Sequence, residues 1–219
     1  RSTLFPYTTL FRSLADEARG TGIRMIPVLV YDRGQCDPRK CTAKRMEKFG
    51  LAREVPLNRI PPGALVLTPS AERALSPADS KYARHGLVVM DLTWAHIGEM
   101  PEVRGSRPRK LPYLVAANPV NFGKPWNLNS AEAVLASLVI MGMDEQAELF
   151  VPRFNWAPTF LTMNRPLLDG YRAAPSSEEV QRLSDEYVES ITGDRGQFRS
   201  PGRDRKSTRL NSSHLAEPR

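Results

Sequence analysis

The chain has 219 residues, 41% of them hydrophobic, and a formal net charge of +7. That length can bury a sizeable core, enough for one large domain or two small ones. No apolar run approaches the roughly 20 residues that a membrane-spanning helix needs, so we expect a soluble protein with no membrane association.

The two ends of the chain look foreign to the rest. Residues 3–13, TLFPYTTLFRS, and 204–214, DRKSTRLNSSH, are similar to conceptual translations of common sequencing adapters. A targeting segment is the alternative for the first, but it lacks the apolar stretch that such segments contain. The flanks 1–13 and 204–219 carry +4 of the formal +7, so the remainder is only modestly basic. We expect both flanks to be artefacts and residues 193–203 to form a tail.

Three short apolar runs in the first half of the chain predict β-strands. They lie at residues 25–31, 64–67 and 87–91, and the first is rich in β-branched side chains. Helical signals separate the runs. Such alternation predicts an α/β fold with a parallel or mixed sheet over residues 14–113.

Two helices are predicted between these strands. Thr42 is a candidate N-cap for a short basic helix that reaches Phe49, and Gly50 follows where a helix commonly ends. The second helix begins at Ser76-Pro77-Ala78-Asp79, which offers a capping hydroxyl, a first-turn proline and an acid. Gly86 would end it.

The second half, residues 114–192, is predicted to be mainly helical. Asn129 and Glu132 have capping-box spacing before an almost wholly apolar helix that ends near Gly142, so that helix should be buried. Further helices are predicted at 144–150, at 166–171 and, after a capping run at 176–179, along an amphipathic segment carrying Val180, Leu183, Tyr187 and Ile191.

The run Leu111 to Gly123, LPYLVAANPVNFG, joins the two halves. Its apolar, strand-like stretch breaks at Asn118-Pro119. Proline has no N–H, so backbone groups nearby are freed for a ligand or for a sharp reversal. A strand that ends in an ordinary turn is an equally good interpretation of this run taken alone.

Four loops that follow strand candidates would meet at the carboxyl edge of the sheet. They lie at residues 35–42, 68–70, 92–96 and 118–123. In open α/β sheets ligands bind at that edge, so we expect the functional site there. The common nucleotide signatures, Walker A among them, do not occur in the sequence.

Cys36 and Cys41 are the only cysteines. Without a second pair they cannot form a four-ligand structural zinc site, and we expect no metal centre. Two cysteines in a chain without a signal segment are more typical of reduced thiols in the cytoplasm than of a disulfide. Neither cysteine has a partner base at a spacing that indicates a catalytic nucleophile.

Three segments together point to a known family. They are QCDPRKCTAKRM at 35–46, MDLTWAHI at 90–97 and the run 111–123. In these segments, and over about residues 23–172, the chain resembles the archaeal and eukaryotic 16S/18S rRNA aminocarboxypropyltransferases, the Tsr3 family.

The resemblance implies an enzyme of ribosome biogenesis. Members transfer the 3-amino-3-carboxypropyl group of S-adenosylmethionine to N3 of an N1-methylated pseudouridine in small-subunit rRNA. The implied fold has a mixed α/β N-terminal sheet domain and a helical C-terminal part, and it is SPOUT-like with a deep trefoil knot. We expect a monomeric cytoplasmic protein whose partner is small-subunit rRNA or a pre-ribosomal particle.

The same resemblance implies a set of cofactor-binding residues. Leu67, Pro69 and Trp94 would form the adenine slot, and the backbone of Leu114 would contact the cofactor. An indole face suits adenine and also attracts a sulfonium cation, whereas a core tryptophan is the alternative for Trp94. Ala43 stands where the family usually has glycine. The full set is Thr42, Leu67, Pro69, Trp94, Leu114, Asn118, Asn121 and Gly123, with the last three as a backbone cradle.

Asp91 is the candidate catalytic residue. It ends a predicted strand, where its carboxylate could orient the cofactor or accept the N3 proton of the base. An ion-pair partner or a loop cap is the alternative. The reaction needs little acid–base chemistry, because a sulfonium is a good leaving group and positioning can supply most of the acceleration.

Basic residues gather in two places that could neutralise RNA phosphates. A solvated loop is the alternative for each. Two other functions stay open, an RNA methyltransferase with a similar cofactor pocket and a non-catalytic ribosome assembly protein. The candidate RNA-binding residues are Arg39, Lys40, Lys44 and Arg45 around the first motif and Arg104, Arg107, Arg109 and Lys110 in a basic loop at 104–110.

Overall fold

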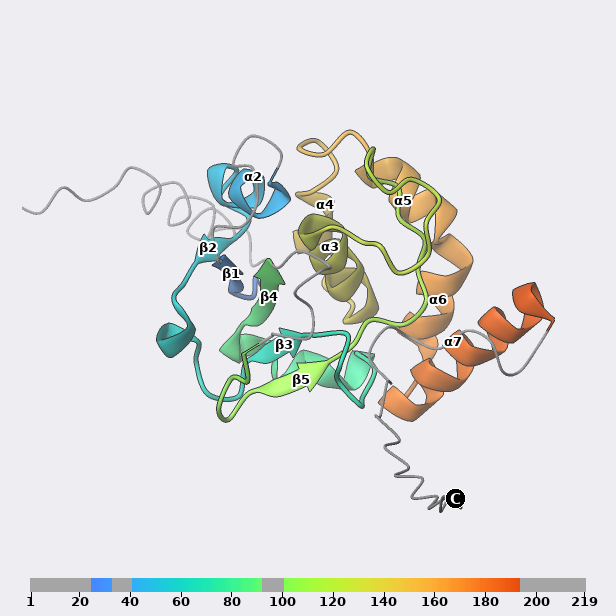
Figure 1. Cartoon of the computed structure of the whole chain (residues 1–219), viewed down its shortest axis with the longest axis horizontal. Helices are drawn as coiled ribbons and strands as arrows, with labels where there is room; N and C mark the ends of the chain where they lie inside the picture. Colours follow the sequence, from blue (N-terminus) through green and yellow to red (C-terminus); the bar gives the residue numbers. More distant parts are fainter. Residues whose placement is uncertain (1–24, 33–40, 92–100, 194–219) are drawn as a thin grey trace, which may run out of the picture.

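A computed structural model describes residues 25–32, 41–91 and 101–193 of the chain (Figure 1). The flanks predicted to be artefacts lie outside these ranges, as does the tail beyond residue 193. None of the described helices combines the length and the apolar character that crossing a membrane requires.

Within the described residues, five strands form one parallel sheet in the order β2-β1-β4-β3-β5. The predicted parallel α/β sheet is therefore confirmed. The three strands expected from apolar runs are present, and two short strands at the sheet edges were not predicted because their side chains are mostly exposed and charged. The strands are β1 (Val28–Asp32), β2 (Arg53–Glu54), β3 (Leu65–Leu67), β4 (Leu87–Asp91) and β5 (Arg107–Arg109).

The helices fall mostly in the second half of the chain, as predicted. Three short 3₁₀ turns lie among the strands: η1 (Leu57–Arg59), η2 (Pro77–Lys81) and η3 (Ala83–His85). The α-helices of the described part are α2 (Thr42–Lys48), α3 (Ser130–Ile140), α4 (Asp144–Glu148), α5 (Ala157–Met163), α6 (Arg165–Ala173) and α7 (Ser177–Thr192).

Two predictions about the first half need correction. The segment from Ser76 to Gly86 is not an α-helix but the pair of 3₁₀ turns η2 and η3, in which the side chain of Asp79 turns into the protein. The N-cap of α2 is Cys41 and not Thr42, since the Cys41 sulfur accepts from the N–H of Lys44 at 3.5 Å.

The main core lies on one face of the sheet. Val28 and Val30 point to this face, and in Figure 1 helices α3 to α6 lie together on that side of the strands. Leu29 and Val88 alternate to the other face, where they belong to a smaller cluster. Helix α3 is buried, as its apolar sequence predicted.

Helix α7 is amphipathic over its first half only. Val180 is fully buried, whereas Tyr187 and Ile191, predicted for the same apolar face, keep more than a third of their surface exposed. The helix packs against α6. It extends outward beyond the side of the sheet where β3 and β5 lie (Figure 1).

Candidate functional site

The carboxyl ends of β1 and β4 bring two aspartates into register. Asp32 and Asp91 each end their strand, and their Cα atoms are ladder partners. The sequence indicated Asp91, whose side chain lies outside the described part. It did not single out Asp32, although Asp32 also ends an apolar run. Two acids thus mark the edge where parallel α/β sheets bind ligands.

Lys44 faces carboxylates and not open solvent. Its Nζ lies 3.1 Å from Oδ2 of the buried Asp32 and contacts Oε2 of Glu54. The hydrogen bond with Glu54, followed by the one with Asp32, holds the pKa of Lys44 well above its usual value in spite of partial burial. The RNA contact at Lys44 stays a prediction, and the two acids beside it compensate its charge.

Helix α2 presents its first residue, Thr42, at the same edge. Residues 33–40, which connect β1 to this helix, lie outside the described residues. Ala43, where the family usually has glycine, is helical and buried in the main core, so a side chain is accommodated there.

The predicted strand between the two halves is not a strand. Its N–H and C=O groups pair with buried side chains of the helices: the Val115 N–H and C=O bind the Asn164 side chain at 2.8 and 2.9 Å. The Tyr113 N–H donates to Ser184 Oγ at 2.9 Å, and the Tyr171 hydroxyl donates to the Tyr113 C=O at 3.0 Å. Burial raises the pKa of Tyr171, so its hydroxyl remains a donor. Side chains from the helical part of the chain thus make the hydrogen bonds that a neighbouring strand would make in a sheet.

Leu114 differs from the residues beside it in this run, because its N–H is buried and has no acceptor among the described residues. Leu114 is fully buried in the main core, and its C=O accepts from the Trp126 N–H at 3.0 Å. No described residue accepts from the Leu114 N–H, while the N–H groups of Tyr113 and Val115 are both paired. A buried unpaired N–H costs about 1–3 kcal/mol and calls for an explanation such as a ligand. It belongs to the residue whose backbone the family resemblance assigns to the cofactor.

The turn that follows is anchored by the carboxylate of Glu132, which is 0% exposed. Oε1 accepts from the N–H groups of Ala117 and Asn118 at 2.7 and 2.8 Å. Oε2 accepts from Asn118 Nδ2 at 2.6 Å and from the Asn129 N–H at 2.9 Å. The predicted capping box of α3 is confirmed. Its glutamate also fixes a turn that precedes the helix, which the sequence pattern did not indicate.

The predicted backbone cradle is corrected by the hydrogen bonds of this turn. The N–H of Asn118 donates to Glu132, that of Asn121 donates to Asn118, and that of Gly123 donates to the Ala116 C=O at 2.8 Å. Gly123 adopts a φ of 76°, a conformation that favours glycine. These three N–H groups stabilise the turn and are not available to a ligand.

Two of the expected walls of the adenine slot lie at the end of β3 and in the turn that follows it. Leu67 ends β3 and belongs to the same buried cluster as Leu114. Pro69 follows in a half-buried turn that the Thr68 N–H ties to the Arg109 C=O at 2.9 Å. Trp94, the third expected wall, lies outside the described residues.

A surface groove of about 600 Å³ lies on the other face of the sheet. Val66 and Met90 line it, together with Thr68, Ser70 and Arg107. Neighbouring residues of a strand point to opposite faces, so Val66 and Leu67 cannot serve the same cavity. Leu67 is absent from the lining of this groove, whereas Thr68 and Ser70, which lie on either side of Pro69, belong to it.

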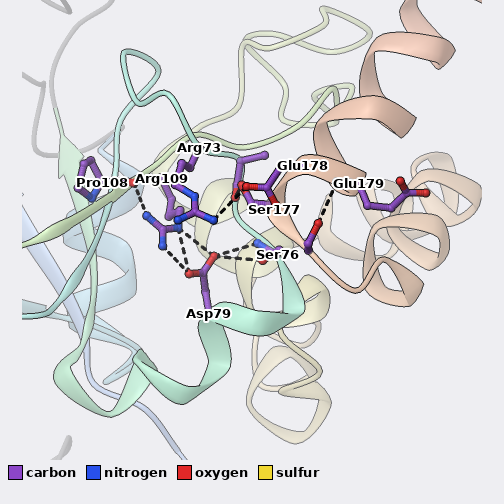
Figure 2. A network of polar contacts seen from close by, with 10 residues as sticks. Arg73, Ser76, Asp79, Pro108, Arg109, Ser177, Glu178 and Glu179 are labelled. Atoms are coloured by element: carbon purple, nitrogen blue, oxygen red, sulfur yellow. Dashed lines mark hydrogen bonds and ion pairs between the residues drawn. The ribbon is translucent and has the colours of Figure 1, made fainter.

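Arg109 is buried in an ion pair and does not form part of an RNA-binding surface. Its Nη2 lies 2.8 Å from Asp79 Oδ1, and the two side chains are only 9% and 4% exposed (Figure 2). Its Nε lies 3.0 Å from both carboxylate oxygens, and its Nη1 donates to the Pro108 C=O at 2.8 Å. The prediction for Arg109 is corrected, and so is the basic loop, because Arg107–Arg109 forms strand β5.

Next to this pair, α7 is joined to the loop after β3. Figure 2 shows Arg73 reaching Glu178, with Nη2 and Oε1 3.0 Å apart. Ser177 Oγ donates to the Ala74 C=O at 2.7 Å. These contacts connect the start of the last helix to the segment that carries Pro69.

Other basic residues of the two clusters remain accessible. The Arg107 guanidinium lies 3.8 Å from the ring centroid of Tyr82, and that of Arg45 lies 5.0 Å from the ring of Phe154. Stacking on a ring holds a guanidinium in place while its outward edge stays open to phosphate. Arg39 and Lys40 lie outside the described residues. The cations with exposed or half-buried side chains are Arg45, Arg104, Arg107 and Lys110.

Comparisons with known proteins agree on one family. A family model described as "Ribosome biogenesis protein, C-terminal" matches residues 65–188. The chain is 44% identical over 172 residues to the 16S rRNA aminocarboxypropyltransferase of Methanosarcina acetivorans, a match that covers 77% of this chain and 98% of that one. It is 37% identical over 169 residues to the 18S rRNA aminocarboxypropyltransferase of Schizosaccharomyces pombe, covering 76% of this chain and 58% of the relative.

A solved structure is also similar. It is that of the SAM-dependent rRNA:acp-transferase Tsr3 from Vulcanisaeta distributa, with a TM-score of 0.66 and 33% sequence identity. The match covers 78% of this chain and 100% of that one.

A second family model, described as "Possible Fer4-like domain in RNase L inhibitor, RLI", matches residues 26–59. A cluster held by four cysteines does not fit this chain, which contains two. Cys41 is buried and caps α2, and Cys36 lies outside the described residues. Within the described part, no group of three or more histidine, cysteine or acidic residues is placed to hold a metal ion.

Proposed function

The chain belongs to the Tsr3 family of 16S/18S rRNA aminocarboxypropyltransferases, and we propose that it transfers the 3-amino-3-carboxypropyl group of S-adenosylmethionine to small-subunit rRNA. The observation that carries the proposal is the buried N–H of Leu114, for which the described residues offer no acceptor. A ring nitrogen of adenine is an acceptor that would satisfy it, and the apolar side chain of Leu67, which belongs to the same buried cluster, suits the face of the ring.

The chain's own residues then bind and orient the reactants. Leu114 would fix the adenine, Pro69 and Trp94 would add walls to its slot, and Thr42 would lie near the methionine moiety. S-adenosylmethionine supplies a sulfonium leaving group, so that transfer breaks a sulfur–carbon bond, forms the carbon–nitrogen bond and leaves 5′-methylthioadenosine. Asp91, beside Asp32 at the sheet edge, would accept the proton that leaves the base nitrogen.

Four accessible cations would hold the RNA backbone. Arg45, Arg104, Arg107 and Lys110 keep side chains that phosphate oxygens can reach, and Arg39 and Lys40 would extend this surface. Arg109 would not take part because it is buried and paired with Asp79, and the charge of Lys44 is compensated by Asp32 and Glu54.

Finer features of the proposal come from the family resemblance. The target would be N3 of an N1-methylated pseudouridine, and the protein would act as a cytoplasmic monomer without a metal centre. The same resemblance implies a SPOUT-like fold with a deep trefoil knot. The division between residues 14–113 and 114–192 would separate the strand-bearing part from the helical part.

A label in the cofactor tests the proposal. S-adenosylmethionine labelled in the carboxyl carbon is expected to label small-subunit RNA, whereas cofactor labelled in the methyl group is expected to leave it unlabelled. Asp91→Asn should lower turnover more than cofactor affinity measured by calorimetry, and Asp169→Asn, an exposed residue of α6, should change neither.

The two rival functions give different results in the same assays. Transfer of the methyl label would show a methyltransferase. RNA binding without any binding of S-adenosylmethionine would show an assembly protein without catalysis.

A further inference from the structure

The turn after Ala117 presents two large apolar side chains to solvent. Val120 is 79% exposed and Phe122 is 62% exposed, the highest values for large hydrophobic residues in the described part of the chain. Burial of either side chain against a partner would be favourable, because it removes apolar surface from water. Single exposed apolar residues are normal, but two within three positions of one turn indicate a contact surface.

The turn holds these side chains in a fixed place. The Ala116 N–H donates to the Lys124 C=O at 3.1 Å, and the Lys124 N–H donates to the Asn121 C=O at 2.9 Å. Asn118 Oδ1 accepts from the Val120 N–H at 3.2 Å, and Glu132 holds Asn118 in turn. A surface that is already ordered loses little conformational entropy when it binds.

The charge around the turn favours an anionic partner. Lys124 is exposed beside Phe122, and the sequence contains no Asp or Glu from Leu111 to Ala131. The nearest acid, Glu132, is buried and accepts four hydrogen bonds. The exposed part of the turn is therefore apolar and cationic.

We propose that this turn binds an unpaired base of the RNA substrate, with Phe122 stacked on the base and Lys124 on an adjacent phosphate. The inference rests on the proposed function for the identity of the partner as RNA. Aromatic side chains are the usual stacking partners of unstacked bases in single-stranded RNA, and every base offers a face for such stacking. The bond between Trp126 N–H and Leu114 C=O closes the base of the same turn, so the docked nucleotide would stand beside the residue that holds the cofactor.

Substitutions at Phe122 separate stacking from other kinds of contact. The probe is a fluorescein-labelled single-stranded oligouridine, with an RNA duplex as the comparison, and binding is followed by fluorescence anisotropy. Phe122→Ala is expected to weaken single-strand binding roughly 5- to 150-fold, which corresponds to ~1–3 kcal/mol. Phe122→Trp should retain the affinity, and Phe122→Leu should lose it because leucine is apolar but cannot stack. Ile191→Ala, an exposed apolar residue of α7, is the matched control and should bind like the parent.

Several outcomes would overturn the inference. Equal affinity of Phe122→Ala and the parent, or an equal loss in duplex binding, would remove base stacking from this turn. Retained affinity in Phe122→Leu would indicate an apolar contact, as a protein partner makes. No binding of oligouridine by the parent chain would also overturn it. Calorimetry with S-adenosylmethionine on the same variants reports on the proposed function independently, because Phe122 lies outside the expected cofactor slot.

Discussion

Replacing Glu132 by glutamine is expected to destabilise the protein strongly. The carboxylate accepts four hydrogen bonds, two on each oxygen, and all its donors belong to the turn or to the start of α3. In Glu132→Gln one oxygen becomes an NH₂ group, which cannot accept and faces two donors. A hydrogen bond to a charged group contributes about 1.5–3 kcal/mol, so loss of two amounts to roughly 3–6 kcal/mol.

That loss is large against a total stability of about 5–15 kcal/mol for a folded domain. Urea unfolding followed by circular dichroism measures it directly. The Tm should fall by roughly 6–24 °C, since each kcal/mol corresponds to about 2–4 °C in a protein of this size. Glu145→Gln, an exposed glutamate of α4, is the matched control and should change the free energy of unfolding by less than about 0.5 kcal/mol.

The position of Glu132 also predicts how the variant responds to salt. Its bonds are fully buried, so added salt should not restore or further reduce the stability of the variant. A free energy of unfolding within about 0.5 kcal/mol of the parent value would refute the argument that this carboxylate anchors the turn.

Three further changes have expected outcomes. Arg109→Met should lower the free energy of unfolding in urea by ~3–5 kcal/mol because the buried carboxylate of Asp79 loses its only cationic partner among the described residues. Combining it with Asp79→Asn, which removes the charge and keeps an acceptor for the Ser76 N–H, should recover part of that loss, and equal stability of the single and double variants would contradict the reasoning. Trp94→Ala should weaken S-adenosylmethionine binding roughly 5- to 150-fold in calorimetry, a loss of ~1–3 kcal/mol, and an unchanged affinity would rule out the proposed adenine slot. Removing residues 1–13 and 204–219 should leave the Tm and cofactor affinity as they are, and a large fall in Tm would show that these flanks belong to the fold.

Local signals in the sequence predicted the parts of the fold that depend on local interactions. The apolar runs became β1, β3 and β4, because a parallel strand buried on both faces is apolar along its length. The box formed by Asn129 and Glu132 marked the start of α3, because both partners lie within one helical turn. Charged edge strands such as β5 carry no such signal, since one face remains in water.

The run that begins at Leu111 shows where local reasoning fails. Up to Ala117 its composition is that of a buried strand, and Tyr113, Leu114 and Ala116 are indeed buried. Asn164 and Ser184, far along the chain, supply the hydrogen bonds that a neighbouring strand would otherwise make. The pattern of apolar residues in a sequence indicates which side chains are buried. It does not indicate which groups form hydrogen bonds with the backbone.

The basic residues make the same point for function. In the sequence, Lys44, Arg107 and Arg109 are equally good candidates for phosphate contacts. In the fold, Lys44 pairs with Asp32 and Arg109 pairs with Asp79, and neither acid is adjacent to its partner in the sequence. Only Arg107 keeps an exposed guanidinium, which stacks on Tyr82. A cation can bind RNA only where the fold leaves its charge uncompensated, so the phosphate-binding surface follows from the placement of acids such as Asp32 and Asp79 as much as from the cations themselves. Cationic clusters in a sequence therefore set an upper limit on the RNA surface, and the buried carboxylates of the fold determine how much of it is used.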